Sequence, residues 1–206
     1  MYRKFIKRTI DVVLSFMGIV VFLVPMLLIS LFIKLDSKGP VIFWQKRVGK
    51  DKQTYMMPKF RTMYTETPSE IPTHLLESPE KWITPVGKFL RKTSLDELPQ
   101  LFSIFAGKMS VVGPRPALWN QFDLLAHRDE YGANSVRPGL TGWAQINGRD
   151  ELPVDVKAKF DGEYIEKMSF LFDCKCFFGT FLKVLRGDGI VEGAQSQAPQ
   201  REKIEK

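Results

Sequence analysis

The sequence predicts an α+β fold that is mainly helical, with a minor β part and a membrane-inserted helical segment at the N-terminus. Three observations predict it. Residues 12–33 form an apolar run without a charged side chain, later segments space their apolar residues as helices do, and two short apolar bursts flank a turn-like Gly-Lys-Asp-Lys. The chain has 206 residues, which suits one globular domain with an appendage.

The apolar run at 12–33 is expected to enter the membrane. As a helix it would be about 33 Å long, which matches the hydrocarbon core of a bilayer. Basic residues flank both ends, with Lys7 and Arg8 before it, so the positive-inside rule puts both flanks on the cytoplasmic face. Pro25 removes a backbone hydrogen bond in mid-run. We therefore expect a re-entrant helix–break–helix anchor over residues 1–35, with a single spanning helix as the alternative.

The remainder, residues 36–190, is expected to form one domain. The bursts "VIFW" and "TYMM" predict a short β-hairpin, and the proline-rich segment at 65–85 predicts a loop or lid. Helices are predicted after it, followed by a loop–strand–loop at "VRPGLTGWAQINGR" and two more helices. The polar tail over residues 191–206 has a composition typical of disorder.

The last predicted helix is dense in phenylalanine. Core packing explains some of these rings. An amphipathic helix lying at the lipid interface is the equal alternative, because aromatic and lysine side chains suit that depth. The residues concerned are Phe170, Phe172, Phe177, Phe178 and Phe181, with Lys175 and Lys183 between them.

Composition limits the chemistry that the chain can perform. Its two cysteines, Cys174 and Cys176, form one C-x-C, which excludes a disulfide framework and a zinc cluster. Only two histidines are present, so a multi-histidine metal site is excluded too. The net charge of +7 favours anionic partners such as nucleic acid, acidic lipid or phosphorylated metabolites. Carboxylates, arginines and a hard cation are what remains for catalysis.

Asp96 and Glu97 are adjacent carboxylates on which most of the functional interpretation depends. They could begin a helix: Ser94 and Glu97 match a capping box, although Pro99 then costs a hydrogen bond, which favours Asp96 itself as the N-cap. The alternative is a catalytic pair aimed at phosphate. Arg91 and the lysine after it would keep the carboxylates ionised and attract phosphate oxygens. An ionised aspartate can attack phosphorus, and its neighbour can help to hold Mg²⁺.

Three further basic residues are candidates for phosphate binding. Arg115 lies between two prolines, so its backbone is stiff. Arg137 opens "RPGLTG", whose glycines let a ligand approach the backbone, and Lys59 lies in "KFRTM". For both arginines a salt bridge to a carboxylate is an equally good interpretation of the local sequence.

Five segments together resemble the small monotopic phosphoglycosyl transferases, the bacterial sugar transferases. They are "KRTIDVVLS", "KFRTM", "LRKTSLDELPQL", "MSVVGPRP" and "RPGLTGWAQINGR", and the resemblance runs from about residue 5 to residue 187. It implies an enzyme that moves a sugar-1-phosphate from a nucleoside diphosphate sugar to a polyprenol phosphate, undecaprenyl phosphate. UDP is the expected nucleotide and UMP the expected product. It also implies the bacterial inner membrane as location, with the catalytic domain on the cytoplasmic face.

The resemblance also implies roles for individual residues. Asp96 would attack the β-phosphorus to give a phosphosugar–enzyme intermediate, and Glu97 would assist with Mg²⁺, the expected cofactor, which the two carboxylates would share. Arg91, Arg115 and Arg137 fall on arginines of the family motifs, and we expect them to bind substrate together with the lysine of "KFRTM".

The family anchor breaks at a Ser-Pro pair, whereas this chain has Val24 and Pro25. Two other functions compete with sugar transfer: a membrane-attached nucleic-acid binder and a non-catalytic membrane scaffold. The first predicts stacking aromatics among clustered basic residues, but here the arginines lie beside prolines and glycines. The intact acidic pair disfavours the second. The expected partners are therefore the bilayer and the two substrates, without nucleic acid, and a homodimer remains open.

Overall fold

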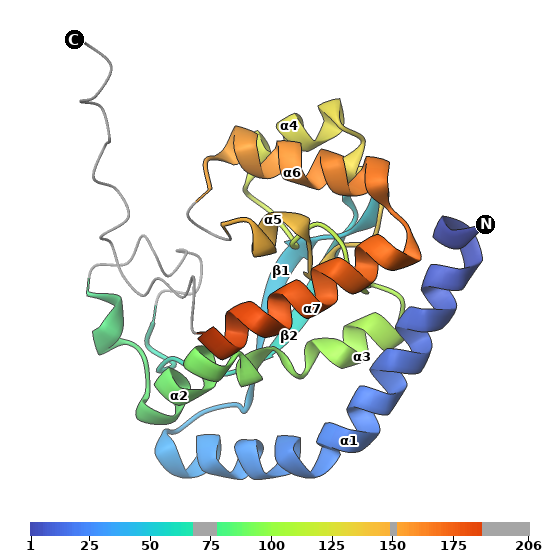
Figure 1. Cartoon of the computed structure of the whole chain (residues 1–206). Helices are drawn as coiled ribbons and strands as arrows, with labels where there is room; N and C mark the ends of the chain where they lie inside the picture. The colour runs from blue at the N-terminus through green and yellow to red at the C-terminus, as the bar shows by residue number, and fades with distance from the viewer. Residues whose placement is uncertain (68–77, 149–151, 187–206) are drawn as a thin grey trace.

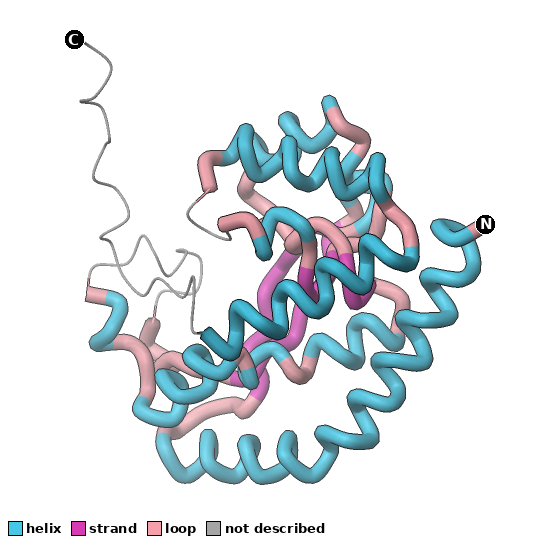
Figure 2. The backbone as a smooth tube through the Cα atoms, viewed as in Figure 1, coloured by secondary structure: helices cyan, strands magenta, loops and turns pink. Residues whose placement is uncertain are grey.

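The fold is mainly helical with two small β-sheets, and a computed structural model describes residues 1–67, 78–148 and 152–186 (Figure 1; Figure 2). Helices surround the strands, which confirms the predicted class. The helices are α1 (Lys7–Asp36), α2 (Pro85–Thr93), α3 (Gln100–Phe105), α4 (Phe122–Glu130), α5 (Trp143–Ile146), α6 (Val154–Lys167) and α7 (Phe170–Arg186), and the strands are β1 (Ile42–Val48), β2 (Thr54–Phe60), β3 (Ser110–Val112) and β4 (Gly139–Thr141).

The N-terminal helix α1 contains Pro25 and bends along its length (Figure 1). Every residue from 7 to 36 is helical, so the expected break into two helices is corrected to a bend. The physical reason is that a proline removes one N–H and crowds the preceding turn, which can bend a helix without ending it. Farther along, the Ser30 hydroxyl donates to the Met26 carbonyl over 2.7 Å and stays within the helix.

Both ends of α1 are tied to the same globular body. Near its start, Lys7 Nζ lies 2.6 Å from Asp173 Oδ2 of α7, and Arg8 Nη1 donates to the Ile104 carbonyl over 2.7 Å. Just beyond its end, the Arg61 guanidinium donates to the Ser37 carbonyl over 2.8 Å. The helix follows the edge of the molecule between these ties (Figure 1). The two flanks of the apolar run therefore lie on one body.

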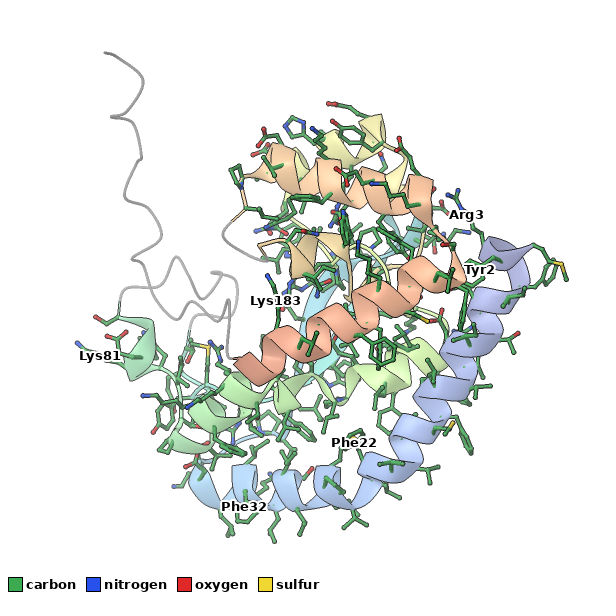
Figure 3. All side chains as sticks on the ribbon, viewed as in Figure 1. Tyr2, Arg3, Phe22, Phe32, Lys81 and Lys183 are labelled. Atoms are coloured by element: carbon green, nitrogen blue, oxygen red, sulfur yellow. The ribbon has the colours of Figure 1, made fainter. Side chains whose placement is uncertain are left out.

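The middle of α1 presents apolar side chains away from that body (Figure 3). Val20 is 59% exposed and Leu27 63% exposed. In the part of the chain that the structure describes, α1 is the one helix long and apolar enough to cross a bilayer. On the side that packs inward, Met26, Ile29 and Ile33 lie against Phe60 and Leu90.

Strands β1 and β2 form the predicted antiparallel hairpin, starting with the pair Ile42 and Phe60. Side chains alternate between the two faces of such a ribbon. In this register Arg47 of β1 shares a face with Met57 and Lys59 of β2. This face is the one that turns toward α3, and it carries the polar side chains of the candidate site.

Strands β3 and β4 form a parallel pair that the sequence did not predict, although β4 lies where a strand was expected. Ser110 pairs with Gly139, and Val112 pairs with Thr141. The backbones come so close that a Cβ at Gly139 would lie 2.1 Å from the Gly113 nitrogen. The short helix α5 follows β4 where a loop was expected. The pairing sets "GPRP", which follows β3, beside β4.

The main core lies where α3, β3, α6 and α7 meet. Ile104, Tyr164 and Cys176 are buried there, and the Tyr164 hydroxyl oxygen lies 3.0 Å from the Val112 carbonyl oxygen, which brings α6 against β3. Burial raises the pKa of the Cys176 thiol to about 12. Cys176 and Cys174 are both free cysteines.

The phenylalanines of α7 divide between two environments. Phe172 packs on Trp143 with ring centroids 4.9 Å apart, and Lys175 Nζ lies 4.8 Å from the centroid of the same indole. Phe170 and Phe178, by contrast, are more than half exposed. Phe172 thus meets the core-packing expectation, whereas Phe170 and Phe178 belong to an apolar surface. Contact of that surface with lipid stays a prediction.

Two predicted segments lie partly or wholly outside the described residues. Of the expected loop or lid at 65–85, residues 68–77 are not described, and the remainder includes a short turn at Pro79–Lys81 before α2. The predicted tail at 191–206 lies wholly outside the described residues.

Candidate active site

Asp96 and Glu97 lie in a short 3₁₀ turn that connects α2 to α3. Ser94 precedes the turn with a left-handed φ of +56° and donates its N–H to carbonyls at the end of α2. Its side chain forms no capping bond, and α3 takes Pro99 as its N-cap. The capping box and the Asp96 N-cap are therefore both wrong. The left-handed serine turns the chain early, so the acidic pair occupies a connection between helices.

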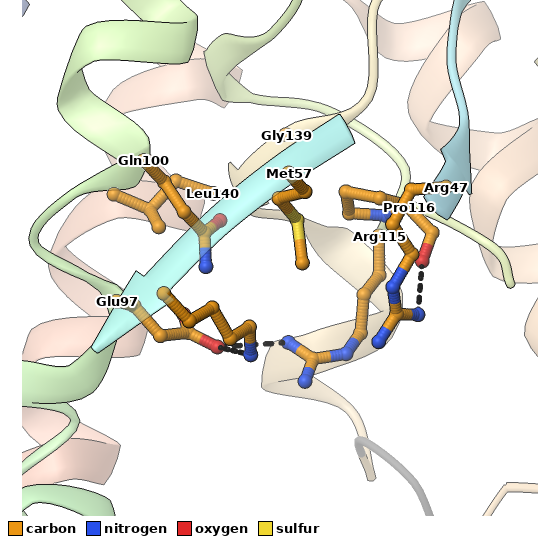
Figure 4. A pocket seen from close by; sticks show the side chains of 9 residues that line it. Arg47, Met57, Glu97, Gln100, Arg115, Pro116, Gly139 and Leu140 are labelled. Carbon is orange, nitrogen blue, oxygen red and sulfur yellow. Dashed lines mark hydrogen bonds and ion pairs between the residues drawn. The ribbon is translucent and has the colours of Figure 1, made fainter. Parts of the chain in front are cut away.

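The Glu97 carboxylate faces two cations from distant parts of the chain (Figure 4). Lys59 Nζ of β2 lies 2.9 Å from Glu97 Oε1, and Arg115 Nη1 of the loop after β3 lies 3.8 Å from the same oxygen. All three side chains are largely buried. The fold thus brings together three of the predicted site residues.

Asp96 is half-buried and its pKa is raised to about 6. Loss of solvent is the main cause, and the charge of Glu97 raises the pKa further. Lys59 and Arg91 act in the opposite direction because they favour the carboxylate. The balance leaves Asp96 mostly ionised at neutral pH, in the state that a nucleophile requires.

Arg91 reaches this site from the last turn of α2. Its Nε donates to Thr62 Oγ1 over 2.9 Å, and its charge is among those that act on Asp96. The structure therefore places Arg91 in the electrostatic surroundings of the acidic pair. Its contact with substrate stays a prediction.

Arg137 lies elsewhere. Its Nε donates over 2.7 Å to the carbonyl of Gly107, which follows the C-terminal end of α3, whereas Glu97 precedes the N-terminal end. Arg8 donates to carbonyls of the same C-terminal turn. The cause is the pairing of β4 with β3, which carries the start of β4 to the far end of α3. Arg137 is thus not brought to the acidic pair, and its geometry is that of a helix cap.

A small pocket adjoins Glu97 and contains two polar residues that sequence reasoning missed, Arg47 and Gln100 (Figure 4). The alternation of β1 carried a signal for Arg47, because the hairpin register puts it on the face of Lys59. Gln100 is nearly completely buried, three residues after Glu97. The lining residues are Arg47, Met57, Lys59, Glu97, Gln100, Arg115, Pro116, Gly139 and Leu140.

Asp96 and Glu97 supply carboxylate oxygens, which are the ligands that a magnesium ion favours. Among the described residues no group of three or more metal-binding side chains gathers. Mg²⁺ is commonly held by one or two carboxylates together with substrate phosphates, so Asp96 and Glu97 fit this donor set without a third acid.

The chain matches the family described as bacterial sugar transferase over residues 2–187. It is 38% identical over 194 residues to UDP-glucose:undecaprenyl-phosphate glucose-1-phosphate transferase of Escherichia coli (strain K12), covering 88% of this chain and 40% of that protein. It is 36% identical over 191 residues to UDP-N-acetylgalactosamine-undecaprenyl-phosphate N-acetylgalactosaminephosphotransferase of Aeromonas hydrophila, covering 90% of this chain and 45% of that protein.

A shorter relative matches along most of its length. The chain is 34% identical over 197 residues to the exopolysaccharide production protein ExoY of Sinorhizobium fredii, covering 89% of this chain and 87% of that protein. The chain thus spans less than half of the two longer relatives and nearly all of ExoY.

Proposed function

Because the chain belongs to the bacterial sugar transferase family, we propose that it transfers a sugar-1-phosphate from a UDP-sugar to undecaprenyl phosphate. The products would be an undecaprenyl diphosphate sugar and UMP, in the first membrane step of surface glycan assembly. Two relatives carry names that mention a UDP-sugar and undecaprenyl phosphate, and this supports these substrates.

The observation that carries the proposal is the convergence of Lys59 and Arg115 on Glu97, beside the half-buried Asp96. Cations that gather next to a nucleophilic carboxylate suit the phosphates of a nucleoside diphosphate sugar, because they stabilise the charge that develops on the phosphoryl oxygens. A structural salt bridge would need only one cation.

The reaction would take place in two displacements at Asp96. An Asp96 carboxylate oxygen forms a bond to the β-phosphorus, the bond from that phosphorus to the bridging oxygen breaks, and UMP leaves with this oxygen. A phosphate oxygen of undecaprenyl phosphate then attacks the same phosphorus, and the Asp96 carboxylate is released. A covalent intermediate lets a soluble donor and a lipid acceptor use one site in turn.

Lys59 and Arg115 would orient the donor phosphates during both displacements. Asp96 and Glu97 would hold Mg²⁺ together with substrate phosphate oxygens, and the ion, when bound, adds stabilisation of phosphoryl charge. Glu97 Oε1 already accepts a hydrogen bond from Lys59 Nζ, so the same carboxylate would contact both the lysine and the ion.

We further propose that α1 enters and leaves the cytoplasmic leaflet of the bacterial inner membrane. Both of its ends are held by one body, whereas a single crossing would put them on opposite sides. The exposed apolar side chains between those ends would lie in lipid. The exposed rings of α7 would lie at the headgroup level, next to the acceptor phosphate.

The first experiment is to measure UMP release from a panel of UDP-sugars with undecaprenyl phosphate and Mg²⁺ in detergent. We expect turnover with one donor or a few, and a loss of more than about 10³-fold in Asp96→Asn, because the nucleophile is gone. Asp51→Asn, in the exposed hairpin turn, is the matched control and should keep full activity. Turnover that survives in Asp96→Asn would exclude Asp96 as the nucleophile.

A further inference from the structure

The loop that carries Arg115 is held by its backbone carbonyls. Four consecutive carbonyls, from residue 114 to residue 117, each accept a hydrogen bond, and the donors come from three separate parts of the fold. The pairs are Gly139 N to Pro114 O at 2.8 Å, Arg128 Nη2 to Arg115 O at 2.9 Å, Arg47 Nη1 to Pro116 O at 2.9 Å and Val48 N to Ala117 O at 2.9 Å.

The donor to the Arg115 carbonyl is unusual because it belongs to a buried ion pair. Arg128 of α4 and Asp161 of α6 have side chains only 4% and 1% exposed. Arg128 Nε and Nη2 lie 2.8 Å and 2.6 Å from Asp161 Oδ2, and the same Nη2 donates to Arg115. The pair thus connects two helices on one side of the site to the backbone of a residue within it.

A buried ion pair is not needed to hold α4 against α6. Removing two charges from water is costly, and well-packed apolar residues often stabilise a fold equally well. What apolar residues cannot supply at this position is an N–H donor for the Arg115 carbonyl. The buried Arg128–Asp161 pair is therefore better explained by its N–H donor to the Arg115 carbonyl than by the packing of α4 against α6.

The close approach of α4 and α6 supports the same conclusion. Gly162, next to Asp161, packs so tightly on the C-terminal end of α4 that a Cβ there would lie 2.7 Å from Cβ of Tyr131, the residue that follows the helix. Ala158, one turn earlier in α6, is completely buried. Small residues on both sides of Asp161 let Arg128 reach across to the loop.

We propose that Arg128 and Asp161 are positioning residues, which hold the Arg115 backbone so that its guanidinium meets the donor phosphates. The inference rests on the proposed function, because it takes Arg115 as a substrate-binding residue. It adds a pair that would act from outside the residues lining the pocket.

The test is the double variant Arg128→Met/Asp161→Leu, which removes both charges together and so avoids leaving one buried and unpaired. We expect its unfolding midpoint to stay near that of the wild type while kcat/KM for the donor falls about 10- to 100-fold, because small displacements of a binding group are costly. Arg128→Lys is the second variant: it keeps the positive charge but lacks the planar fork that serves Asp161 and the carbonyl together.

The decisive comparison repeats these variants in an Arg115→Ala background. Because the pair acts through Arg115, neither variant should lower kcat/KM by more than about twofold there, which is the non-additivity expected of coupled residues. Equal losses in both backgrounds, or no loss in the presence of Arg115, would overturn the inference. Lys52→Gln/Asp129→Asn is the matched control, since Asp129 neighbours Arg128 on α4 but its exposed ion pair does not contact the loop.

UMP affinity, measured by calorimetry on the same proteins, separates this inference from the proposed function. The two positioning variants should weaken UMP binding only when Arg115 is present. A wild type that binds UMP but releases none from any donor would refute sugar transfer alone. If the wild type turns over but the variants lose the same amount of kcat/KM with and without Arg115, only the positioning role is refuted.

Discussion

At the scale of single residues, the environment of Asp96 favours reactivity over stability. Burial and the neighbouring Glu97 make its ionised form less favourable, while Lys59 and Arg91 recover part of that cost. A nearby cation normally lowers the pKa of a carboxylate, yet the pKa of Asp96 is raised despite Lys59 and Arg91. Burial thus keeps its ionised form partly destabilised, as is common at catalytic sites.

This charge balance predicts how stability depends on pH. In protein without metal or substrate, Asp96 has a pKa of about 6 in the folded state and 3.8 as its ordinary value. The folded state therefore binds more protons between these values, and wild-type stability should fall as pH rises from about 4 to about 6. An asparagine side chain cannot ionise, so Asp96→Asn should lose this dependence. The measurement is the free energy of unfolding of both proteins by chemical denaturation at a series of pH values. The wild-type value minus the variant value gives the contribution of Asp96.

The neighbours of Asp96 provide the controls for that titration. Glu97→Gln should move the midpoint to lower pH because it removes a negative charge, and Lys59→Met should move it to higher pH because it removes a positive one. A wild-type difference curve that is flat from pH 4 to pH 6 would show that Asp96 is not perturbed.

At the scale of secondary-structure elements, the start of α1 is fixed to α7 by one carboxylate with three donors. Asp173 accepts hydrogen bonds from the Tyr2 hydroxyl, from Lys7 Nζ at 2.6 Å and from the Tyr164 hydroxyl at 2.8 Å. Asp173 and Lys7 are each little more than one-tenth exposed. This junction joins the anchor helix to the core, and removing one charge of its largely buried pair should cost far more than breaking a surface ion pair.

Asp173→Ala should therefore lower the free energy of unfolding by about 3 kcal/mol, because it leaves the Lys7 charge largely buried without its partner. Denaturant unfolding in detergent measures the loss. Lys167→Gln, which removes an exposed ion pair on α6, is the comparison and should change little. Similar losses in the two variants would mean that the junction contributes no more than a surface pair.

The topology proposed for α1 predicts the accessibility of its two flanks. Cysteines introduced as Arg3→Cys and Lys38→Cys should both be protected from a membrane-impermeant reagent added to intact cells, and both should react after permeabilisation. The reason is that ties at each end hold both flanks on one side. Reaction of only one flank in intact cells would establish a single crossing instead.

At the scale of the whole molecule, the site is assembled from parts that are distant in the chain. Lys59 comes from the hairpin, Glu97 from the turn between α2 and α3, and Arg115 from the loop after β3. Around that loop, β1, β4 and α4 each supply a donor to a backbone carbonyl. The site therefore depends on long-range packing, whereas each contributing side chain belongs to a short local motif.

Local patterns predicted a large part of this arrangement. The apolar run identified α1, two apolar bursts around a turn-like Gly-Lys-Asp-Lys identified the hairpin, and helical spacing identified α6 and α7. Motif resemblance singled out Lys59, Glu97 and Arg115, which share the pocket. The same motifs could not show that Arg137 lies at the other end of α3, because a motif specifies residue types and order but not which strand pairs with which.

The sequence by itself determined the elements and the chemistry available to them, since periodicity, charge and turn residues act over a few neighbouring positions. Tertiary structure decided the bend in place of a break in α1, the pairing of β3 with β4, the left-handed Ser94 and the burial that raises the pKa of Asp96. It also decided that Arg128 and Asp161 lie behind the Arg115 loop. The strand pairing, the burial of Asp96 and the position of the Arg128–Asp161 pair depend on contacts between residues tens of positions apart, and such contacts are settled only when the whole chain packs.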